Sequence, residues 1–297
     1  MKKNKNLQKN LEWFVGFAEG QDSWQITNNR NIFLLTMTQP QVLYRIKTLL
    51  KIGKIRGPIE TKEGKKYYTY IVGDMKGTSK IIDVFNGKLV LDNNKKIFEK
   101  YVTLYNKRCT TDTVEHRITA PGDMLSQHVL GLDKKNFIDN KIYPSFNDGW
   151  LSGYIDSKGI FSGIFKKKKD EIIGLRTRFT LAQKDEKKIY EFLKKLLGGT
   201  LHYEKNSNIY HLTVGANLQI GKLLKYLNTY SLYSTKSIAL ARFKKIYVRM
   251  TDGQFKFRLE SPRAKKRMIN LIRNINKDRE NNKPCTTEQQ NADNDKL

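Results

Sequence analysis

Two apolar runs in this sequence each end in polar side chains with definite chemistry. LEWFVGFAEGQDSW ends in Glu19, Gln21 and Asp22, and LSGYIDSKGIF ends in Asp156 and Lys158. Carboxylate oxygens suit Mg²⁺, and a pair of such ions can promote phosphodiester hydrolysis. The neutral amide oxygen of Gln21 is a weak ligand for this ion, and the ammonium group of Lys158 repels it. The two segments therefore combine residues that favour this chemistry with residues that oppose it.

The histidines and cysteines do not add a metal site. They lie without the spacing of zinc ligands, at His116, His128, His202, His211, Cys109 and Cys285. We therefore predict no metal centre and no disulfide framework, and expect a reducing interior as the setting.

The charge of the chain points to a polyanionic partner. The sequence has 56 Lys and Arg against 29 Asp and Glu, a formal net charge of +27, which favours nucleic acid. The surplus is spread from Lys2 to Arg279, whereas a membrane-surface protein would concentrate it on one amphipathic helix. The basic start, MKKNKNLQKN, precedes no long apolar run, so we expect neither a secretory signal nor a membrane partner.

The choice among basic residues suggests an origin. Lysine outnumbers arginine 42 to 14, and asparagine reaches 24 residues. Such a bias is typical of an AT-rich genome, so we expect an organelle-encoded protein of the mitochondrial matrix.

The sequence repeats one long plan twice. An apolar run with small residues starts each copy, at Phe14 and at Leu151, and strand and helix patterns follow in the same order. TMTQ at 36–39 matches TLAQ at 180–183, whereas YTYIVG and SKIIDVFN match YHLTVG and GKLLKYLN at a constant offset of 142. Each copy reads as helix, hairpin, helix, hairpin, helix. This predicts an α+β fold with antiparallel sheets, and a monomer with internal pseudo-symmetry.

The repeat and the composition predict four segments. The first unit spans 1–108, a Pro- and Gly-containing linker spans 109–146, and the second unit spans 147–274. Residues 275–297 carry no aromatic residue and are predicted to form a disordered polar tail.

FVGFAEGQDSW and LSGYIDSKG resemble the two motifs of a single-chain LAGLIDADG homing endonuclease. Flanking phrases such as TQPQVLYRIKTLLKIGKIR and PSFNDGWLSGYID are similar to organellar, intron-encoded members of this family. The resemblance covers most of the chain. It implies two pseudo-symmetric units with saddle-shaped antiparallel sheets over DNA, and two motif helices packed at a pseudo-twofold axis.

The resemblance also implies where divalent metal would bind. The metal-binding acid of each motif falls on Gln21 and on Lys158, so we predict no catalytic residue, no metal and no cofactor. Mg²⁺ would enter only if Asp22 replaced the lost acid, and a shift of one residue turns a side chain by roughly 100° on a helix. Glu19 and Asp156 occupy positions where family members commonly carry acids with a structural role.

Small residues are expected where the two motif helices touch. Close helix packing needs small side chains, and the two motifs place them at Gly16, Gly20, Gly153 and Ser157. We therefore expect the helix pair to be retained.

The strands after each motif should present polar groups with a period of two to a phosphate backbone. Ile32 and Leu34, with Ile160 and Ile164, would share this face and weaken the readout of bases. A second basic region follows later in the chain, as RFKKIYVR and SPRAKKR. The predicted nucleic-acid contacts are Ser23, Gln25, Thr27, Lys158, Ser162, Lys166, Lys167, Lys168, Lys169, Arg176, Arg178, Lys244 and Lys245.

Three functional hypotheses remain open. The first is a protein without nuclease activity that binds structured RNA in preference to duplex DNA, as a group I intron splicing cofactor (a maturase) or as a structural subunit of a ribonucleoprotein such as the mitochondrial ribosome. The second is an active, Mg²⁺-dependent homing endonuclease that uses Asp22 or another displaced acid. The third is a silenced nuclease that still binds its DNA target.

Overall fold

The computed structural model describes residues 2–21, 23–61, 64–115, 132–169, 171–252 and 261–276. Asp22, Cys285, His116, His128 and residues 277–297 of the predicted tail lie outside these ranges, as does the side chain of Lys167. Within them, the chain divides into a first unit, residues 18–142, and a second unit, residues 1–17 with 143–297. No helix in these ranges has both the length and the apolar character needed to cross a membrane.

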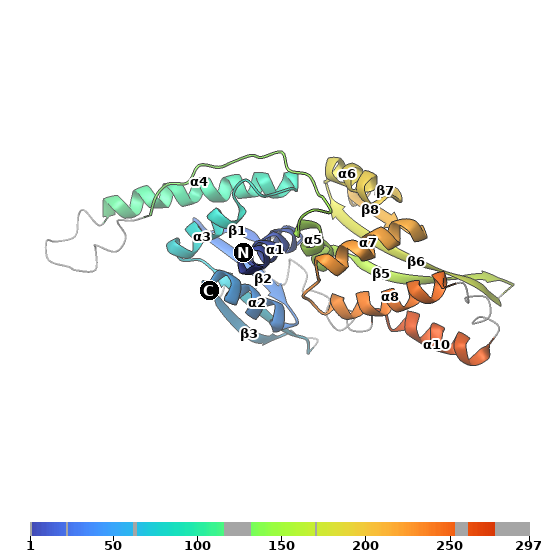
Figure 1. Ribbon diagram of the computed structural model, residues 1–297. Helices are drawn as coiled ribbons and strands as arrows, with labels where there is room; N and C mark the ends of the chain where they lie inside the picture. The colour runs from blue at the N-terminus through green and yellow to red at the C-terminus, as the bar shows by residue number, and fades with distance from the viewer. Residues whose placement is uncertain are drawn as a thin grey trace. The chain divides into compact units, whose positions relative to one another are not determined.

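Each unit contains one four-stranded antiparallel sheet with helices, so the predicted α+β class and the repeated plan are confirmed (Figure 1). The strand orders are β1-β2-β4-β3 and β5-β6-β8-β7, which are the same order in the two copies. Helix α1 (Lys2–Glu19) starts in the second unit and ends in the first.

The first unit continues with β1 (Trp24–Thr27), β2 (Arg30–Met37), α2 (Pro40–Leu50), β3 (Lys54–Glu60), β4 (Lys66–Val72), α3 (Met75–Phe85) and α4 (Asp92–Glu115). The second unit contains α5 (Trp150–Lys158), β5 (Ile160–Lys168), β6 (Glu171–Lys184), α6 (Lys187–Leu197), β7 (Thr200–Glu204), β8 (Ile209–Val214), α7 (Asn217–Thr229), α8 (Lys236–Thr251) and α10 (Pro262–Arg273).

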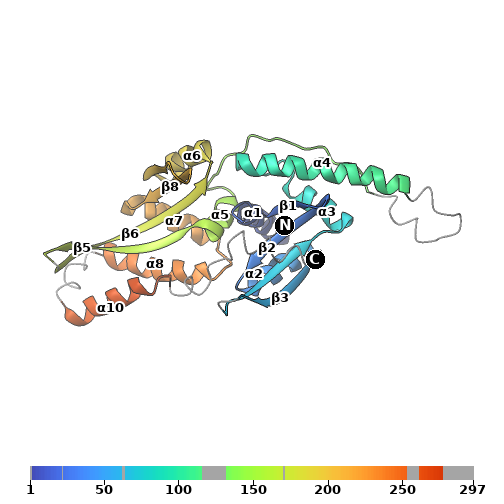
Figure 2. The same cartoon turned by 180° about the vertical axis from the view of Figure 1, so that it is seen from behind.

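One face of each sheet forms the core. In the second unit, Phe161, Phe179 and Leu212 are completely buried, and helices α6, α7, α8 and α10 contact the strands. Phe243 of α8 lies over Phe161, with 5.1 Å between the ring centroids. Figures 1 and 2 show α8 and α10 running beside the long β5–β6 hairpin. Side chains alternate between the two faces along a strand, so the residues between these core residues point to the opposite face of the sheet.

The strand register refines the predicted alignment of the repeats. Helices α3 and α7 begin at Met75 and Asn217, which are 142 residues apart, as the sequence pattern predicts. In β2, however, Thr36 pairs with Thr69, and the residue at the corresponding place in β6 is Ala182, which pairs with His211. The prediction that TMTQ matches TLAQ is therefore two residues out of register. Because two residues is one strand period, it still assigns each residue to the correct face.

In both copies, the helix after the first hairpin buries one apolar stripe. Val42, Leu43, Ile46 and Leu50 of α2 are buried. In α6 the buried residues are Ile189, Tyr190, Leu193 and Leu197. Phe192 lies beside this stripe, is half-buried, and stacks on Tyr143 with 4.9 Å between the ring centroids.

The motif helices α1 and α5 touch through their backbones. A Cβ atom added to Gly16 would lie 2.0 Å from the carbonyl oxygen of Trp150, and one added to Gly153 would lie 1.8 Å from that of Trp13. Gly149, the residue before α5, also lies against α1, and its N–H donates a hydrogen bond of 2.8 Å to a carboxylate oxygen of Glu12. Side chains at these points would force the helices apart.

A buried carboxylate holds the far end of α5. Asp156 accepts hydrogen bonds from the indole Nε1 of Trp13 at 3.1 Å, from the backbone N–H groups of Tyr233 at 2.6 Å and Ser234 at 3.0 Å, and from the Ser234 hydroxyl. Burial raises the pKa of Asp156, whereas Lys236 and the hydrogen bonds from Tyr233 and Ser234 oppose the rise. The carboxylate thus joins α1, α5 and the turn before α8.

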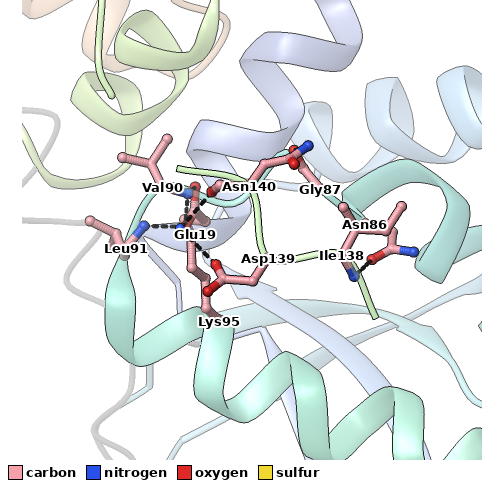
Figure 3. Close-up of polar contacts among 9 residues, drawn as sticks. All are labelled: Glu19, Asn86, Gly87, Val90, Leu91, Lys95, Ile138, Asp139 and Asn140. Carbon is pink, nitrogen blue, oxygen red and sulfur yellow. Dashed lines mark hydrogen bonds and ion pairs between the residues drawn. The ribbon is translucent and has the colours of Figure 1, made fainter. Parts of the chain in front are cut away.

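Glu19 makes the equivalent connection in the first unit, as Figure 3 shows. Its carboxylate accepts from the backbone N–H groups of Val90 at 3.0 Å and Leu91 at 2.8 Å, just before α4 begins. The amide of Asn94 donates to the Glu19 carbonyl oxygen at 2.8 Å. In both copies, the first acid of the motif therefore binds the turn that precedes a later helix of its own unit.

Part of the predicted linker packs on the first unit. Residues 109–115 extend α4, and residues 132–142 run beside this helix (Figures 1 and 2). The side-chain amide of Asn86 donates to the carbonyl oxygen of Asn136 at 2.7 Å and accepts from the N–H of Ile138 at 2.9 Å. Asn106 pairs in the same way with both backbone groups of Lys135, each at 2.8 Å. The polar composition of this segment is therefore consistent with ordered contacts.

The second unit extends beyond residue 274, the predicted end of this unit. Ile275 is 1% exposed, and the amide of Asn276 donates to the carbonyl oxygen of Phe161 at 2.8 Å. The structure therefore places these two residues, which the composition assigns to the tail, in the packed second unit.

Gly153→Ala is expected to destabilise the protein by about 1–3 kcal/mol, because the added methyl group would overlap the backbone of α1. Gly215→Ala is the matched control, since its Cβ would meet only the Thr177 carbonyl oxygen at 3.6 Å. Urea unfolding measures the difference. Equal stability of the two variants would contradict the close helix contact.

Asp156→Asn is expected to cost about 3 kcal/mol, because an amide group would direct its own N–H donors at the donors that now surround the carboxylate. Glu191→Gln, on the exposed side of α6, is the control and should change the free energy of unfolding by less than about 0.5 kcal/mol. A stability of Asp156→Asn equal to that of the control would rule out the anchoring role of this residue.

Candidate nucleic-acid interface

Lys158 is the last residue of α5 and is half-buried. It precedes Gly159, whose N–H closes the helix on the Ile155 carbonyl oxygen at 2.8 Å. The ammonium group of Lys236 reaches the same end and donates to the carbonyl oxygens of Ile155 at 3.1 Å and Ser157 at 2.8 Å. Cations are favoured at a helix C-terminus, where backbone carbonyls carry partial negative charge. This helix end therefore has two ammonium groups and one buried carboxylate.

Gln21 follows the end of α1 in the first unit. Its backbone N–H donates to the Ala18 carbonyl oxygen at 3.0 Å, which closes the last turn, and its side chain is half-buried. Gly20, beside it, is buried in the same turn. The nearest acid in sequence within the described ranges, Glu19, already accepts hydrogen bonds from two backbone N–H groups. Gln21 thus brings a neutral amide where the family resemblance places a carboxylate.

These side chains do not fit divalent metal. Magnesium in a nuclease site needs carboxylate oxygens with free lone pairs, and the described residues Gln21 and Lys158 offer an amide and an ammonium group instead. The acids Glu19 and Asp156 are engaged by backbone donors. Among the residues that the structure describes, no group of three or more His, Cys, Asp or Glu side chains could hold an ion.

The non-core face of the second sheet carries the basic residues of the predicted interface. Arg176 and Arg178 are exposed, and the residues that alternate with them, Leu175, Thr177 and Phe179, are buried. The register pairs Arg178 with Ser162 and Arg176 with Ile164, so these four residues share the face. Lys166, Lys168 and Lys169 are exposed near the tip of the same hairpin. This face therefore combines basic, hydroxyl and aliphatic groups.

The first sheet is less polar on the equivalent face. Gln25 and Thr27 are half-buried, and Gln25 pairs with Ile32. Leu34 is on this face but only 8% exposed. Ser23 is completely buried, and its hydroxyl donates to the Ala18 carbonyl oxygen at 2.9 Å. The prediction that Ser23 contacts nucleic acid is therefore wrong, because its position is before the strand and its hydroxyl holds the end of α1.

Lys244 and Lys245 belong to a different surface. They are exposed on α8, whose Phe243 and Ile246 are buried in the core of the second unit. Lys244 donates to the side-chain oxygen of Asn228 at 3.0 Å. Because α8 covers the core face of the sheet, these lysines lie on the opposite side of it from Arg176 and Arg178.

The sequence patterns missed two groups of polar residues. The first is Lys236, which is distant from α5 in the sequence and lies beside it only in the folded protein, so no sequence pattern predicts the contact. His202 and His211 are paired across β7 and β8 on the non-core face, and the His211 ring lies 3.4 Å from Glu204. The pKa of Glu204 is lowered by hydrogen bonds from the Ser207 hydroxyl and from His211. The alternation of polar and apolar residues along β7 and β8 could have predicted that His202 and His211 share a face.

The family described as LAGLIDADG endonuclease matches residues 151–247. A probable intron-encoded endonuclease 4 of Neurospora crassa is 28% identical over 244 residues, covering 81% of this chain and 40% of that protein. An uncharacterized cox1 intron-2 protein of Schizosaccharomyces pombe is 24% identical and covers 72% of this chain and 58% of that protein. The chain thus spans about two fifths to three fifths of the length of these relatives.

Solved structures share the fold. The LAGLIDADG homing endonuclease I-GzeII in complex with its DNA target has a TM-score of 0.67 and 18% identity, over 89% of this chain and 97% of that one. The homing endonuclease I-SmaMI bound to cleaved DNA has a TM-score of 0.66 and 19% identity, over 89% and 95% of the two chains. The family match over residues 151–247, the intron-encoded relatives and the two motifs support a single-chain, two-motif LAGLIDADG protein, and the solved structures show the shared fold.

Proposed function

We propose that this chain binds structured RNA without cleaving nucleic acid, as a splicing cofactor of a group I intron. The observation that carries the proposal is the pair Gln21 and Lys158, which occupy the positions that the family uses for metal-binding acids. The neighbouring acids Glu19 and Asp156 serve as backbone anchors. Within the described residues, the helix ends therefore keep the side chains that hold the fold, and Gln21 and Lys158 replace the acids that would hold metal.

The exposed cations of the second sheet would bind the phosphate backbone. Arg176 and Arg178 offer planar guanidinium groups that can donate two hydrogen bonds to one phosphate, and the hairpin lysines add charge at the edge. Lys158 could neutralise a phosphate near the end of α5, but an ammonium group does not activate water as a bound metal does. Ile160 and Ile164 beside these cations supply no donor or acceptor, which favours recognition of backbone shape over base sequence.

The relatives support an intron as the source of the RNA. Their names describe intron-encoded proteins, one of them from a cox1 intron. Together with the lysine and asparagine bias of the sequence, this favours an organelle-encoded protein that acts in the mitochondrial matrix. A structural subunit of a ribonucleoprotein such as the mitochondrial ribosome would use the same surfaces and is a variant of this proposal.

The second candidate is a DNA endonuclease, or a silenced endonuclease that retains its DNA target. The names of the relatives and the DNA in the similar solved structures favour it. It requires that Asp22, which lies outside the described residues, or another acid supply the metal ligand. Here Mg²⁺ would provide the water activation that the side chains of Gln21 and Lys158 do not.

The two candidates differ in cleavage and in preference for RNA. We expect the purified protein to leave its gene's insertion-site DNA uncut in Mg²⁺, and to bind the intron transcript more tightly than that duplex at equal salt, because the motif ends lack metal ligands. Cleavage gels and fluorescence anisotropy measure the two properties.

Asp22→Ala is the control in the cleavage assay. DNA cutting that this substitution abolishes would establish the endonuclease and refute the proposal. Without cutting, tighter binding of the DNA duplex than of the transcript would favour the silenced nuclease. Crosslinking in the native organelle, followed by sequencing of the attached RNA, distinguishes an intron from ribosomal RNA.

Arg176→Gln with Arg178→Gln is expected to weaken transcript binding and to lower the slope of log K against log salt by roughly 2, one for each lost phosphate contact. Lys194→Gln with Lys195→Gln removes the same charge from exposed positions on α6, on the core side of the sheet. Equal losses in the two variants would mean that overall charge, rather than this sheet face, determines binding.

A further inference from the structure

The two copies of the repeat differ in the charge of their helices. Helices α3 and α4 of the first unit contain seven basic and five acidic residues, a net charge of +2. Their counterparts α7 and α8 contain seven basic and no acidic residues, a net charge of +7. Both pairs pack on a sheet of the same strand order, so packing does not require the difference.

One position shows this change clearly. Asp83 in α3 forms an ion pair with Lys135, with 2.8 Å between Oδ1 and Nζ. An offset of 142 residues, the displacement between the starts of the helices, places Lys225 of α7 at the corresponding position, where it is exposed. A paired acid in one copy is thus an exposed base in the other.

Helix α10 extends the basic surface. It contains five basic residues and no acid, it contacts α8, and Arg242 of α8 donates to the Asn274 carbonyl oxygen at 2.7 Å. Met268 and Ile275 fix it to the unit by burial. The exposed basic side chains of α7, α8 and α10, here called the helical basic surface, are Lys222, Lys225, Lys244, Lys245, Arg263, Lys266, Arg267 and Arg273.

The side chains of this surface suit a phosphate backbone more than unpaired bases. The aromatic residues of the three helices, Tyr226, Phe243 and Tyr247, are buried or half-buried, and the Tyr247 hydroxyl donates to the Asn217 carbonyl oxygen at 3.1 Å. Proteins that bind single strands stack bases on exposed aromatic rings. Lysine and arginine without such rings favour contact with a double-helical backbone.

We propose that the helical basic surface is a second docking site, for the phosphate backbone of a double-helical RNA segment. It lies on the opposite side of the sheet from Arg176 and Arg178, so one straight duplex cannot cover both faces of the unit. A folded RNA with several helical segments can reach both. The inference rests on the proposed RNA-binding function and specifies a site outside the sheet face that the family resemblance implicates.

The test uses a variant of the full chain with Lys225→Gln, Lys245→Gln, Lys266→Gln and Arg267→Gln. Its matched control carries Lys76→Gln, Lys80→Gln, Lys96→Gln and Lys100→Gln on α3 and α4, which are also exposed. The probe is a labelled double-helical RNA of arbitrary sequence, followed by anisotropy across a salt series. A duplex DNA of the same sequence is the comparison, and circular dichroism melting verifies folding.

We expect the first variant to bind the RNA duplex at least about 10-fold more weakly, with the salt slope lowered by roughly 3–4, and the control to match the wild type. Wild-type affinity of the first variant, equal loss in the control, or a loss confined to DNA would overturn the second site. If the wild-type protein binds the RNA duplex and the first variant binds it equally well, only this inference fails. If the wild-type protein binds neither the RNA duplex nor the intron transcript, the proposed function fails with it.

Discussion

The backbone contact between the two motif helices is the constraint on which the second unit depends. Gly16 and Gly153 leave no room for a Cβ atom, and each faces a carbonyl oxygen of the opposite helix. This approach brings the Trp13 indole to the carboxylate of Asp156, which in turn holds the turn at Tyr233 and Ser234. Helix α8 starts directly after this turn. A methyl group at either glycine would therefore disturb contacts well beyond the helices themselves.

Different residues of each motif serve the fold and the chemistry that the family resemblance implies. Glu19 and Asp156 are buried and bind backbone donors in equivalent turns, so their substitution would leave those donors unsatisfied. Gln21 and Lys158 are half-buried at the helix ends, where a change of side chain disturbs less packing. The fold accommodates an amide and an ammonium group at these positions, whereas loss of an anchor would destabilise it.

The sequence predicted the fold because its patterns are local. The period of two in Arg176 and Arg178, the matched glycines and the offset of 142 between α3 and α7 all follow from short stretches. Contacts between distant residues were not accessible in this way. Ser23 reads as an exposed strand residue until its bond to Ala18 is known, and the amides of Asn86 and Asn106 resemble ordinary polar positions until residues 132–142 pack against them. The function of the interface stays a prediction because charge indicates a polyanion without identifying it.

The division of α1 between the two units has a consequence for synthesis. The first unit is contiguous, from residue 18 to 142, whereas the second needs residues 1–17 together with the chain from 143 onward. Trp13 and Phe17 therefore leave the ribosome long before α5, their packing partner, exists. The 137 residues that separate Gly16 from Gly153 take about 7–27 s to translate at 5–20 residues per second. During that interval, the Trp13 and Phe17 side chains lack the helix that covers them in the folded protein.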